Sequence, residues 1–281
     1  GHDPGAGLPF DRIRAQSELR LSGVDTGAAP LKLELLAYNL DKNKVMAEVI
    51  QAQLKDVLGV AVSVELYDPK AFRAQIDLGA FPLWQGMWGA DYPDMTNFVD
   101  YHFGGGSSAQ FGKHFDDLVA AISEGAAGAN DDARKPSYEK VNNLIKQHVP
   151  MVPIAHGGSG VAYRADVGNP HVSPLGNEEF FMMTPGDRDT FVWMQNGEPG
   201  GLYCADESDG ESLRVCEQIL ESLYGYEVAG TKAIPALAKE CTPSADLMTW
   251  TCTLNDATFG NGATLDANDV VMSFGVQWDA A

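Results

Sequence analysis

The sequence predicts an α/β fold with parallel strand pairing in its first half. The segments 31–38 and 60–67 are apolar or alternate apolar with polar residues, as β-strands do. The segment 43–58 between them repeats its apolar residues at helical spacing. This strand–helix–strand order continues into a second helix and a third strand, and such an order favours a parallel sheet covered by helices.

The first helices follow from local signals. Residues 9–22 favour a short helix that ends at Gly23. The helix at 43–58 suits an end at Gly59, because glycine readily adopts the left-handed conformation of a helix C-terminus. The residues expected on its apolar face are Val45, Val49, Ile50, Leu54 and Leu58.

A second helix and a third strand complete this pattern. Asp68 and Pro69 suit the start of a helix to about Leu78, because Asp caps helix N-termini and Pro fits the first turn. The segment 81–89 predicts a strand that runs into a glycine-containing loop. The next expected elements are helices at 114–126 and 131–148, a buried strand at 150–157, an extended run at 159–164, and a linker or surface loop at 168–188.

The last third of the chain starts a new α/β pattern. The expected elements are a strand at 190–195, an amphipathic helix at 210–224, two β-like runs at 234–241 and 248–254, and a helix at 266–278 with Asp266 as its N-cap. The length of 281 residues accommodates one large domain or two ordinary domains. We expect an N-terminal helix and loop at 1–30, one α/β lobe at 31–155 and a second α/β region at 156–281.

Composition and charge exclude several classes of protein. An apolar content of 44% and a charged content of 21% are typical of globular chains. No run of about twenty apolar residues, the length that spans a membrane, occurs in the sequence. The net charge of −20 argues against nucleic acid as a partner. The acidity fits either solubility or a preference for cationic ligands, and its spread along the chain favours solubility.

Four cysteines lie in the last third of the chain: Cys204, Cys216, Cys241 and Cys252. They form no C-x-x-C pair and have no nearby histidine, so a zinc site is not expected. Cys241 and Cys252 lie on the two β-like runs, where an antiparallel hairpin would place them opposite each other. Cys204 precedes the helix that contains Cys216. We expect two local disulfides and an oxidising compartment, in preference to four reduced, buried thiols.

The sequence lacks the common motifs of metal-dependent and nucleotide-dependent enzymes. It contains no H-E-x-x-H, no G-x-x-x-x-G-K-[ST] and no G-x-G-x-x-G after a strand. The segment HGGSG at 156–160 differs from a nucleophile elbow, because Val161 stands two residues after Ser159 where glycine is required. We therefore expect no catalytic residue, no metal and no cofactor.

The segment GMWGADYPDMTNFVDYHF at 86–103 resembles the peptide/nickel family of ABC-transporter solute-binding proteins. The likeness continues in KVMAEVIQAQLKDVLGVAVSVELYD before it and in YEKVNNLIKQHVPMVPIAHGGSGVAYRADVGN after it. The last part of the chain resembles the beginning of the same family, in FVWMQNGEPGGLYCADESDGESLRVCEQILESLYGYE and IPALAKECTPSADLMTWTCTLNDATFGNGATLDANDVVMSF. Gly260-Asn261-Gly262 stands where the family usually has His-Asp-Gly.

The resemblance covers nearly the whole chain, but in an unusual order. The family's end comes first and its beginning comes second, and the family's small additional domain has no counterpart. The chain therefore resembles a circularly permuted and truncated member of the family. Joining the family's two chain ends is compatible with its topology, because both ends belong to the same lobe.

The resemblance implies periplasmic-binding-protein-like lobes of type II with mixed sheets. It implies a monomeric, extracytoplasmic solute-binding component of an ABC importer, periplasmic or on the cell surface, with a lipid anchor as one form of the native full-length protein. The ligand would be a peptide or a similar small solute, and the partner would be the membrane permease of the ABC transporter. The alternative is an incomplete binding-protein fragment that acts as a structural or interaction module.

The resemblance also implies a ligand site at Asp91, whose counterpart in the family pairs with the amino terminus of a bound peptide. A carboxylate in a cleft suits this role, because its pairing strengthens as water is excluded. The alternative is a loop Asp that caps the next turn. Met87 and Gly89 match positions whose backbone groups bond an extended ligand in the manner of strand addition.

Aromatic and polar residues complete the expected site. Trp88 and Tyr92, with Trp84, form either a pocket wall for ligand side chains or part of the core. We expect at least one of Trp84 and Trp88 to lie in the core. Asn196 and Glu198 match the loop after the family's first strand, which faces the ligand from the opposite lobe, and the alternative is a plain turn.

Overall fold

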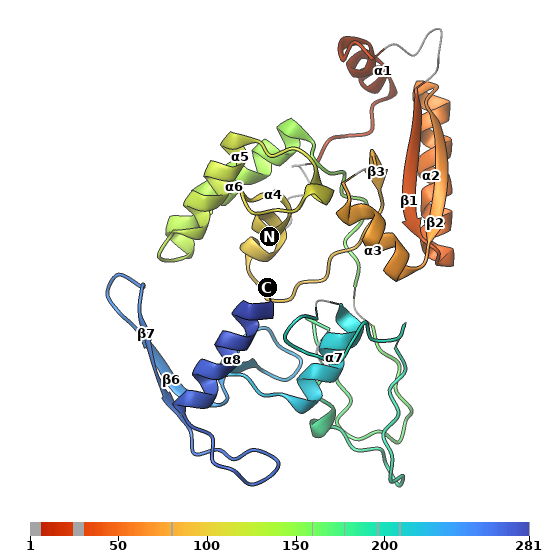
Figure 1. Cartoon of the computed structure of the whole chain (residues 1–281). Coiled ribbons are helices and arrows are strands. Elements are labelled where there is room, and N and C mark those ends of the chain that lie inside the picture. The colour runs from red at the N-terminus through yellow and green to blue at the C-terminus, as the bar shows by residue number, and fades with distance from the viewer. Residues whose placement is uncertain are drawn as a thin grey trace. The chain divides into compact units, whose positions relative to one another are not determined.

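The computed structural model describes residues 7–24, 31–79, 81–158, 160–176, 178–195, 197–207 and 209–280. The chain forms two compact units, whose elements are shown in Figure 1. The first unit comprises Gly1–Ala90 and Asp94–Ile154, and the second comprises Asp91–Pro93 and Ala155–Ala281. The lobes expected at 31–155 and 156–281, with a separate segment at 1–30, stay a prediction.

The first unit contains a parallel sheet of three strands in the order β2-β1-β3. The strands are β1 (Lys32–Tyr38), β2 (Ala61–Tyr67) and β3 (Leu83–Trp84). Helix α2 (Asp41–Leu58) connects β1 to β2, and helix α3 (Pro69–Asp77) connects β2 to β3. The parallel pairing predicted from the strand–helix–strand order is therefore confirmed.

The central strand β1 sends alternate side chains to opposite faces of this sheet. Leu35 and Ala37 pack in one apolar cluster with Ala47 of α2. Leu36, between them in sequence, packs in another cluster with Phe72 of α3. Helix α2 therefore covers one face of the sheet and α3 covers the other (Figure 1).

Helix α2 turns a different face to the sheet from the one expected. Val45 and Val49 are 59% and 49% exposed, so their predicted core positions are wrong. Ala47 and the polar Asn43 are buried instead. The other predicted residues of this face do pack against the core, namely Ile50, Leu54 and Leu58. A face predicted from large apolar residues alone is wrong here. The buried face also includes Asn43 and Ala47, whose side chains are polar and small.

Helix α1 (Arg12–Leu21) packs against α2. The Arg12 guanidinium pairs with the Asp56 carboxylate at 2.7 Å. Leu19 lies against the apolar cluster of β1 and α2. The N-terminal helix expected at 9–22 therefore forms, and it belongs to the first unit.

Three predicted helix ends are confirmed. Gly59 ends α2 in the left-handed conformation, with a φ of 71°. The Asp68 carboxylate accepts a hydrogen bond from a first-turn backbone N–H of α3 at 3.0 Å. Asp266 accepts from the backbone N–H of Asn268 at 2.7 Å, and its own N–H donates to the Asp269 carboxylate at 2.8 Å. These two bonds cap the start of the C-terminal helix.

The rest of the first unit is helical. It contains α4 (Met95–Phe103), the 3₁₀ helix η1 (Ala109–Phe111), α5 (Asp116–Ala126) and α6 (Asp131–His148). The buried residues of their common core are Val99, Phe103, Leu118, Ala121, Ile122, Tyr138 and Val141. Helices α5 and α6 agree with the prediction. Helix α4 is absent from the prediction, although Asp94 at its N-cap is a helix-start signal.

The second unit consists of short elements. They are η2 (Phe180–Met182), α7 (Gly210–Ile219), β4 (Tyr224–Tyr226), β5 (Ala233–Pro235), β6 (Ala238–Pro243), β7 (Trp250–Leu254) and α8 (Ala267–Ala280). Strand β4 pairs with β5 and β6 pairs with β7, both in the antiparallel sense. Helix α7 is shorter than the helix expected at 210–224, because the chain becomes extended at Leu220.

Several strands expected from the sequence are wrong. Of the segment 81–89, only Leu83 and Trp84 form a strand. The described residues of 150–157 and 190–195 form no strand. The segment at 150–157 is also not buried, because the side chains from 151 onwards are exposed.

The segment 190–195 shows why the strand pattern misleads. Phe191 and Trp193 are partly buried and lie beside Phe180, at 5.4 and 4.9 Å between ring centroids. Val192 and Met194 are 82% and 92% exposed. The side chains therefore alternate as in a strand, but pairing requires a neighbouring strand that local sequence does not reveal.

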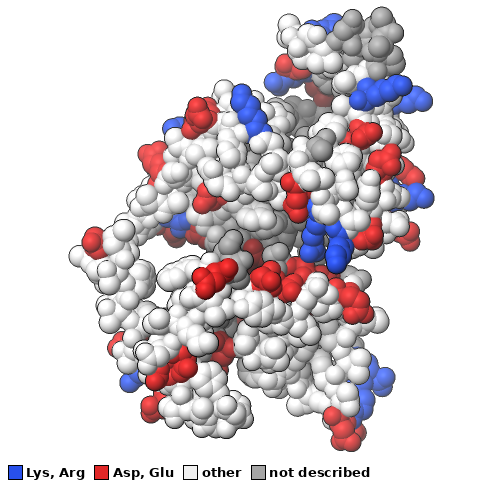
Figure 2. Space-filling view, viewed as in Figure 1, with Lys and Arg blue, Asp and Glu red and all other residues white. Residues whose placement is uncertain are grey.

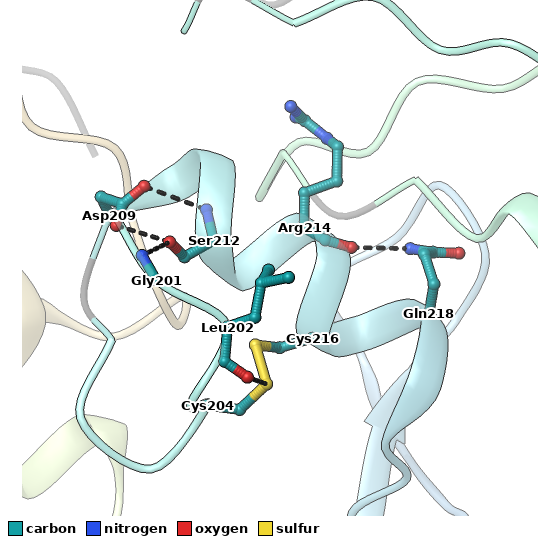
Figure 3. Close-up of a disulfide and its surroundings, with 8 residues drawn as sticks. All are labelled: Gly201, Leu202, Cys204, Asp209, Ser212, Arg214, Cys216 and Gln218. Atoms are coloured by element: carbon teal, nitrogen blue, oxygen red, sulfur yellow. Dashed lines mark hydrogen bonds between the residues drawn. A yellow bond between two sulfur atoms is a disulfide. The ribbon is translucent and has the colours of Figure 1, made fainter. Parts of the chain in front are cut away.

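Both expected disulfides are present. Cys241 of β6 lies directly opposite Cys252 of β7, and the two are bonded. Cys204 is bonded to Cys216 of α7, which Figure 3 shows in close-up. The bond fastens Cys204, in the loop before α7, to the helix itself.

A group of contacts that we call the α7 clasp holds the segment 173–180 against α7. The Glu178 carboxylate, 2% exposed, pairs with the Arg214 guanidinium at 3.2 Å. The same guanidinium donates to the Gly176 carbonyl at 2.7 Å. Gln218, one helical turn further, donates to the Glu178 carbonyl and accepts from the Phe180 N–H. Figure 3 shows Arg214 and Gln218 on the same helix.

The α7 clasp lies between a connecting segment and the part of the chain that resembles the beginning of the solute-binding family. The segment 173–180 follows the family's end-like part, and α7 belongs to the part that resembles its beginning. Arg214 also lies over the Trp193 ring at 5.3 Å, a cation–π distance.

Replacing Arg214 with methionine is expected to destabilise the second unit, because it leaves the buried Glu178 carboxylate without its cation. Breaking a buried pair in this way typically costs about 3–5 kcal/mol. Denaturant unfolding followed by circular dichroism measures the loss. The control is Lys232→Met, which removes an exposed pair with Glu227 and should change stability little. Equal losses in the two variants would contradict the role of the clasp.

Candidate ligand-binding site

The candidate site begins where the chain leaves the parallel sheet. After β3, the Gln85 N–H donates to the Leu36 carbonyl at 2.8 Å, which extends the pairing by one residue. The chain then forms the connection to α4 that contains Met87, Trp88 and Gly89. This connection lies at the carboxyl end of β3, and ligands of open parallel sheets commonly bind outside the carboxyl ends of strands.

Trp88 is held by α4. Its indole Nε1 donates to Oδ1 of Asn97 at 3.1 Å, and Asn97 is only 3% exposed. Its ring stacks on Tyr101, with 4.3 Å between ring centroids and an interplanar angle of 26°. His102 meets the same indole edge-on at 4.8 Å. Trp88 nevertheless stays 36% exposed, so part of the ring faces solvent.

Trp84 has the opposite role. It packs against the cluster of Leu36 and Phe72 beneath α3, and its Nε1 donates to the Gln110 carbonyl at 2.9 Å. The expectation that at least one of the two tryptophans lies in the core thus agrees with the position of Trp84. The two side chains differ because the ladder of β3 ends at Trp84, and Trp88 lies beyond it.

An ion pair fixes the start of α4. The Asp94 carboxylate caps the helix by accepting from the Thr96 N–H at 2.9 Å. It also accepts two hydrogen bonds from the Arg134 guanidinium of α6, at 2.7 and 2.6 Å. These bonds with Arg134 hold the pKa of Asp94 well below its usual range. Arg134 further donates to Tyr138 Oη at 3.0 Å, so α4 and α6 are tied through one bidentate contact.

The residues predicted for the site are divided between the two units. Met87, Trp88 and Gly89 belong to the first unit, and Met87 is 68% exposed. Asp91 and Tyr92 belong to the second unit and are exposed. Glu198 is an exposed residue of the second unit, whereas Asn196 lies outside the described residues.

Sequence reasoning missed the residues that surround Trp88. Asn97, Tyr101 and His102 all lie on α4, which was not predicted. The spacing of four residues between Asn97 and Tyr101 places them on one face of a helix. The signal that could have found them is the N-cap Asp94, which starts the helix directly after the candidate ligand segment.

His102 lies inside the aromatic cluster. Its Nδ1 is 2.6 Å from the Phe98 carbonyl, and its ring lies 4.7 Å from the Phe111 ring. Burial lowers the pKa of His102 from its ordinary value of 6.5, and the hydrogen bond to Phe98 opposes this effect. The neutral ring, with its proton on Nδ1, suits these surroundings.

Figure 2 shows acidic side chains on both units in the face that it presents. No group of three or more His, Cys, Asp or Glu residues in the described part of the chain is arranged to hold a metal ion. None of the described helices is both long enough and apolar enough to cross a membrane. The side chains at the candidate site carry aromatic, amide and carboxylate groups.

Lowering the pH is expected to weaken the first unit through His102. The depressed pKa means that the folded protein binds fewer protons than the unfolded chain as the pH falls through 6.5. This contribution to stability is present above that pH and is lost as the pH falls toward the folded-state pKa. Unfolding free energies at about pH 7.5 and about pH 5.5 measure the loss.

The matched variants for this measurement are His102→Phe and His114→Phe. The first keeps an aromatic ring in the cluster and should reduce the pH dependence. The second replaces an exposed histidine of the same unit and should leave the pH dependence in place. An unchanged pH dependence in His102→Phe would refute the assignment.

The comparisons with known proteins agree on one family. Residues 2–110 match the family described as bacterial extracellular solute-binding proteins, family 5 Middle. Di/tripeptide-binding protein 3 of Pseudomonas aeruginosa is 26% identical over 188 residues, which cover 63% of this chain and 34% of the relative. The periplasmic oligopeptide-binding protein OppA of Salmonella typhimurium is 28% identical over 132 residues, which cover 46% of this chain and 24% of that protein.

Two solved structures share the fold. The dipeptide-binding protein from Pseudoalteromonas, in complex with Met-Leu, superposes with a TM-score of 0.53 at 23% identity, covering 62% of this chain and 36% of that one. The pheromone receptor PrgZ superposes with a TM-score of 0.54 at 20% identity, covering 63% of this chain and 34% of that one.

The match to di/tripeptide-binding protein 3 spans only 34% of the length of that relative. Within that limit, sequence and fold point the same way. The resemblance predicted from the sequence is confirmed: the chain is similar to bacterial extracellular solute-binding proteins in sequence, and its matched part has the α/β fold of the two solved peptide-binding structures.

Proposed function

We propose that this chain is the ligand-binding part of an extracytoplasmic solute-binding protein of an ABC importer, with peptides or similar small solutes as its ligands. The observation that carries the proposal is the partly exposed Trp88, held by α4 at the carboxyl end of the sheet within the family-matched region. The relatives are named for binding dipeptides, tripeptides and oligopeptides, which supports this ligand class.

Asp91 is proposed to bind the positive amino terminus of the peptide. It lies three residues after Trp88, in the exposed connection between β3 and α4. A carboxylate and an ammonium group form a charge-assisted hydrogen bond, which strengthens when the ligand displaces water. Tyr92 and Trp88 would then contact the ligand side chains, and the backbone of Met87 and Gly89 would bond the extended peptide.

Asn196 and Glu198 are proposed to contact the ligand as well. Binding would proceed without chemistry, and the protein would deliver its ligand to the membrane permease as a monomer. We place it outside the cytoplasm, in the periplasm or at the cell surface, with lipid anchoring as one form of attachment. The two disulfides support an oxidising compartment. The net charge of −20 supports a function without nucleic acid.

Replacing Asp91 with asparagine is expected to weaken binding of dipeptides that carry a free amino terminus. A hydrogen bond to a charged group contributes about 1.5–3 kcal/mol, so the dissociation constant should rise on the order of ten- to hundredfold. Isothermal titration calorimetry with a panel of dipeptides and tripeptides measures the change. Asp189→Asn, which alters another exposed carboxylate of the second unit, is the matched control.

N-acetylated versions of the same peptides isolate the contact. Acetylation removes the ammonium group, so Asp91→Asn should have little further effect on an acetylated peptide. An equal loss for free and acetylated peptides would argue that Asp91 acts through the fold. Unchanged affinity of Asp91→Asn for free peptides would remove Asp91 from the site.

A further inference from the structure

We propose that Trp88 and Tyr101 together form an aromatic wall that selects ligands with an aromatic side chain, and that Asn97 and His102 are its positioning residues. This inference deepens the proposed function and rests on it. Nothing in the family resemblance singled out Tyr101, Asn97 or His102. Their assignment comes from the contacts around the Trp88 ring.

The wall consists of two stacked rings that both remain open to solvent. The centroids of Trp88 and Tyr101 lie 4.3 Å apart and their planes differ by 26°. Trp88 is 36% exposed and Tyr101 is 48% exposed. Rings that serve only the core are covered more completely, as Phe72 is at 0% exposure. A stacked pair with exposed surface offers further π-surface to a third ring.

Neighbouring side chains fix the orientation of the wall. The buried Asn97 holds the indole through Nε1 at 3.1 Å. His102 lies edge-on to both rings, at 4.8 Å from Trp88 and 5.2 Å from Tyr101. Phe111 meets both Tyr101 and His102 edge-on, at 5.6 and 4.7 Å between ring centroids. A ligand therefore meets rings whose rotation is already restricted, which lowers the entropic cost of binding.

The position of the wall connects it with ligand binding. Trp88 stands between Met87 and Gly89, the two residues predicted to bond the ligand backbone, and Met87 is 68% exposed. A flexible thioether beside stacked rings is a surface that adapts to apolar side chains. The ion pair of Asp94 and Arg134 fixes α4, which carries Tyr101.

The ring geometry favours aromatic over saturated side chains of the same size. Both kinds of side chain gain from leaving water, roughly in proportion to their apolar area. An aromatic ring gains in addition from offset or edge-to-face contact, which corresponds to about two- to tenfold in affinity. Phenylalanine and cyclohexylalanine separate the two effects, because they differ in the π-system and hardly in size.

The test compares the affinities of Ala-Phe, Ala-cyclohexylalanine and Ala-Ala, with the reversed dipeptides, for the whole chain. Calorimetry should give an aromatic preference, the ratio of cyclohexylalanine to phenylalanine dissociation constants, of about two- to tenfold. Tyr101→Leu should reduce this preference to about one while Ala-Ala still binds. Tyr101→Phe keeps the ring and should retain the preference.

Variants of Asn97 and Trp250 complete the experiment. Asn97→Leu removes the acceptor of the indole N–H and should lower both the aromatic preference and the near-ultraviolet circular dichroism of the stacked rings. Asn97→Asp keeps an acceptor oxygen and should restore both. Trp250→Leu, which removes a 59% exposed tryptophan of the second unit, should change neither.

The outcomes separate this inference from the proposed function. If the native chain binds dipeptides without an aromatic preference, or if Tyr101→Leu keeps the preference, the aromatic wall is wrong and the peptide-binding function stands. If the native chain binds no dipeptide or tripeptide of the panel, both are overturned. Should Tyr101→Leu fail to fold, the ratio for the native chain and the Tyr101→Phe variant still decide the matter.

Discussion

The contact between Asp94 and Arg134 is the interaction on which the candidate site depends. The Asp94 carboxylate caps the N-terminus of α4. It accepts hydrogen bonds from the Thr96 backbone N–H and from two nitrogens of the Arg134 guanidinium. Because Arg134 belongs to α6, the start of α4 is fixed against the helical core of the first unit. Trp88 in turn takes its orientation from α4, through Asn97 and Tyr101. A chain of contacts thus runs from a core helix to a partly exposed indole.

The second unit also contains an ion pair between an arginine of a helix and a carboxylate, and here it holds an irregular segment. Arg214 of α7 binds the carboxylate of Glu178 and the carbonyl of Gly176, and so fastens an irregular segment to a helix. Long stretches of this unit lack regular secondary structure, and backbone groups there need partners other than a strand ladder. The α7 clasp and the disulfide of Cys204 supply part of that support. Side-chain contacts and covalent bonds thus replace part of what a sheet would provide.

Local sequence predicted the elements whose signals are local. The caps at Asp68 and Asp266, the parallel order of the sheet, and the disulfides all involve residues close in sequence or patterns repeated along one element. The strand expected at 190–195 failed for the opposite reason, since Phe191 and Trp193 have the pattern but no ladder forms there. A strand exists only when a distant segment pairs with it, and a period of two residues does not identify that segment.

The sequence by itself determined the α/β class and the resemblance to the solute-binding family, because the motif residues that carry it, such as Trp88 and Asp91, lie close together along the chain. Only the tertiary structure decided which residues surround Trp88, because Tyr101 and His102 reach it through the packing of α4. The same holds for the face of α2, where Asn43 and Ala47 are buried and two valines are not. Burial depends on where the neighbouring elements lie, and that position is a property of the whole fold.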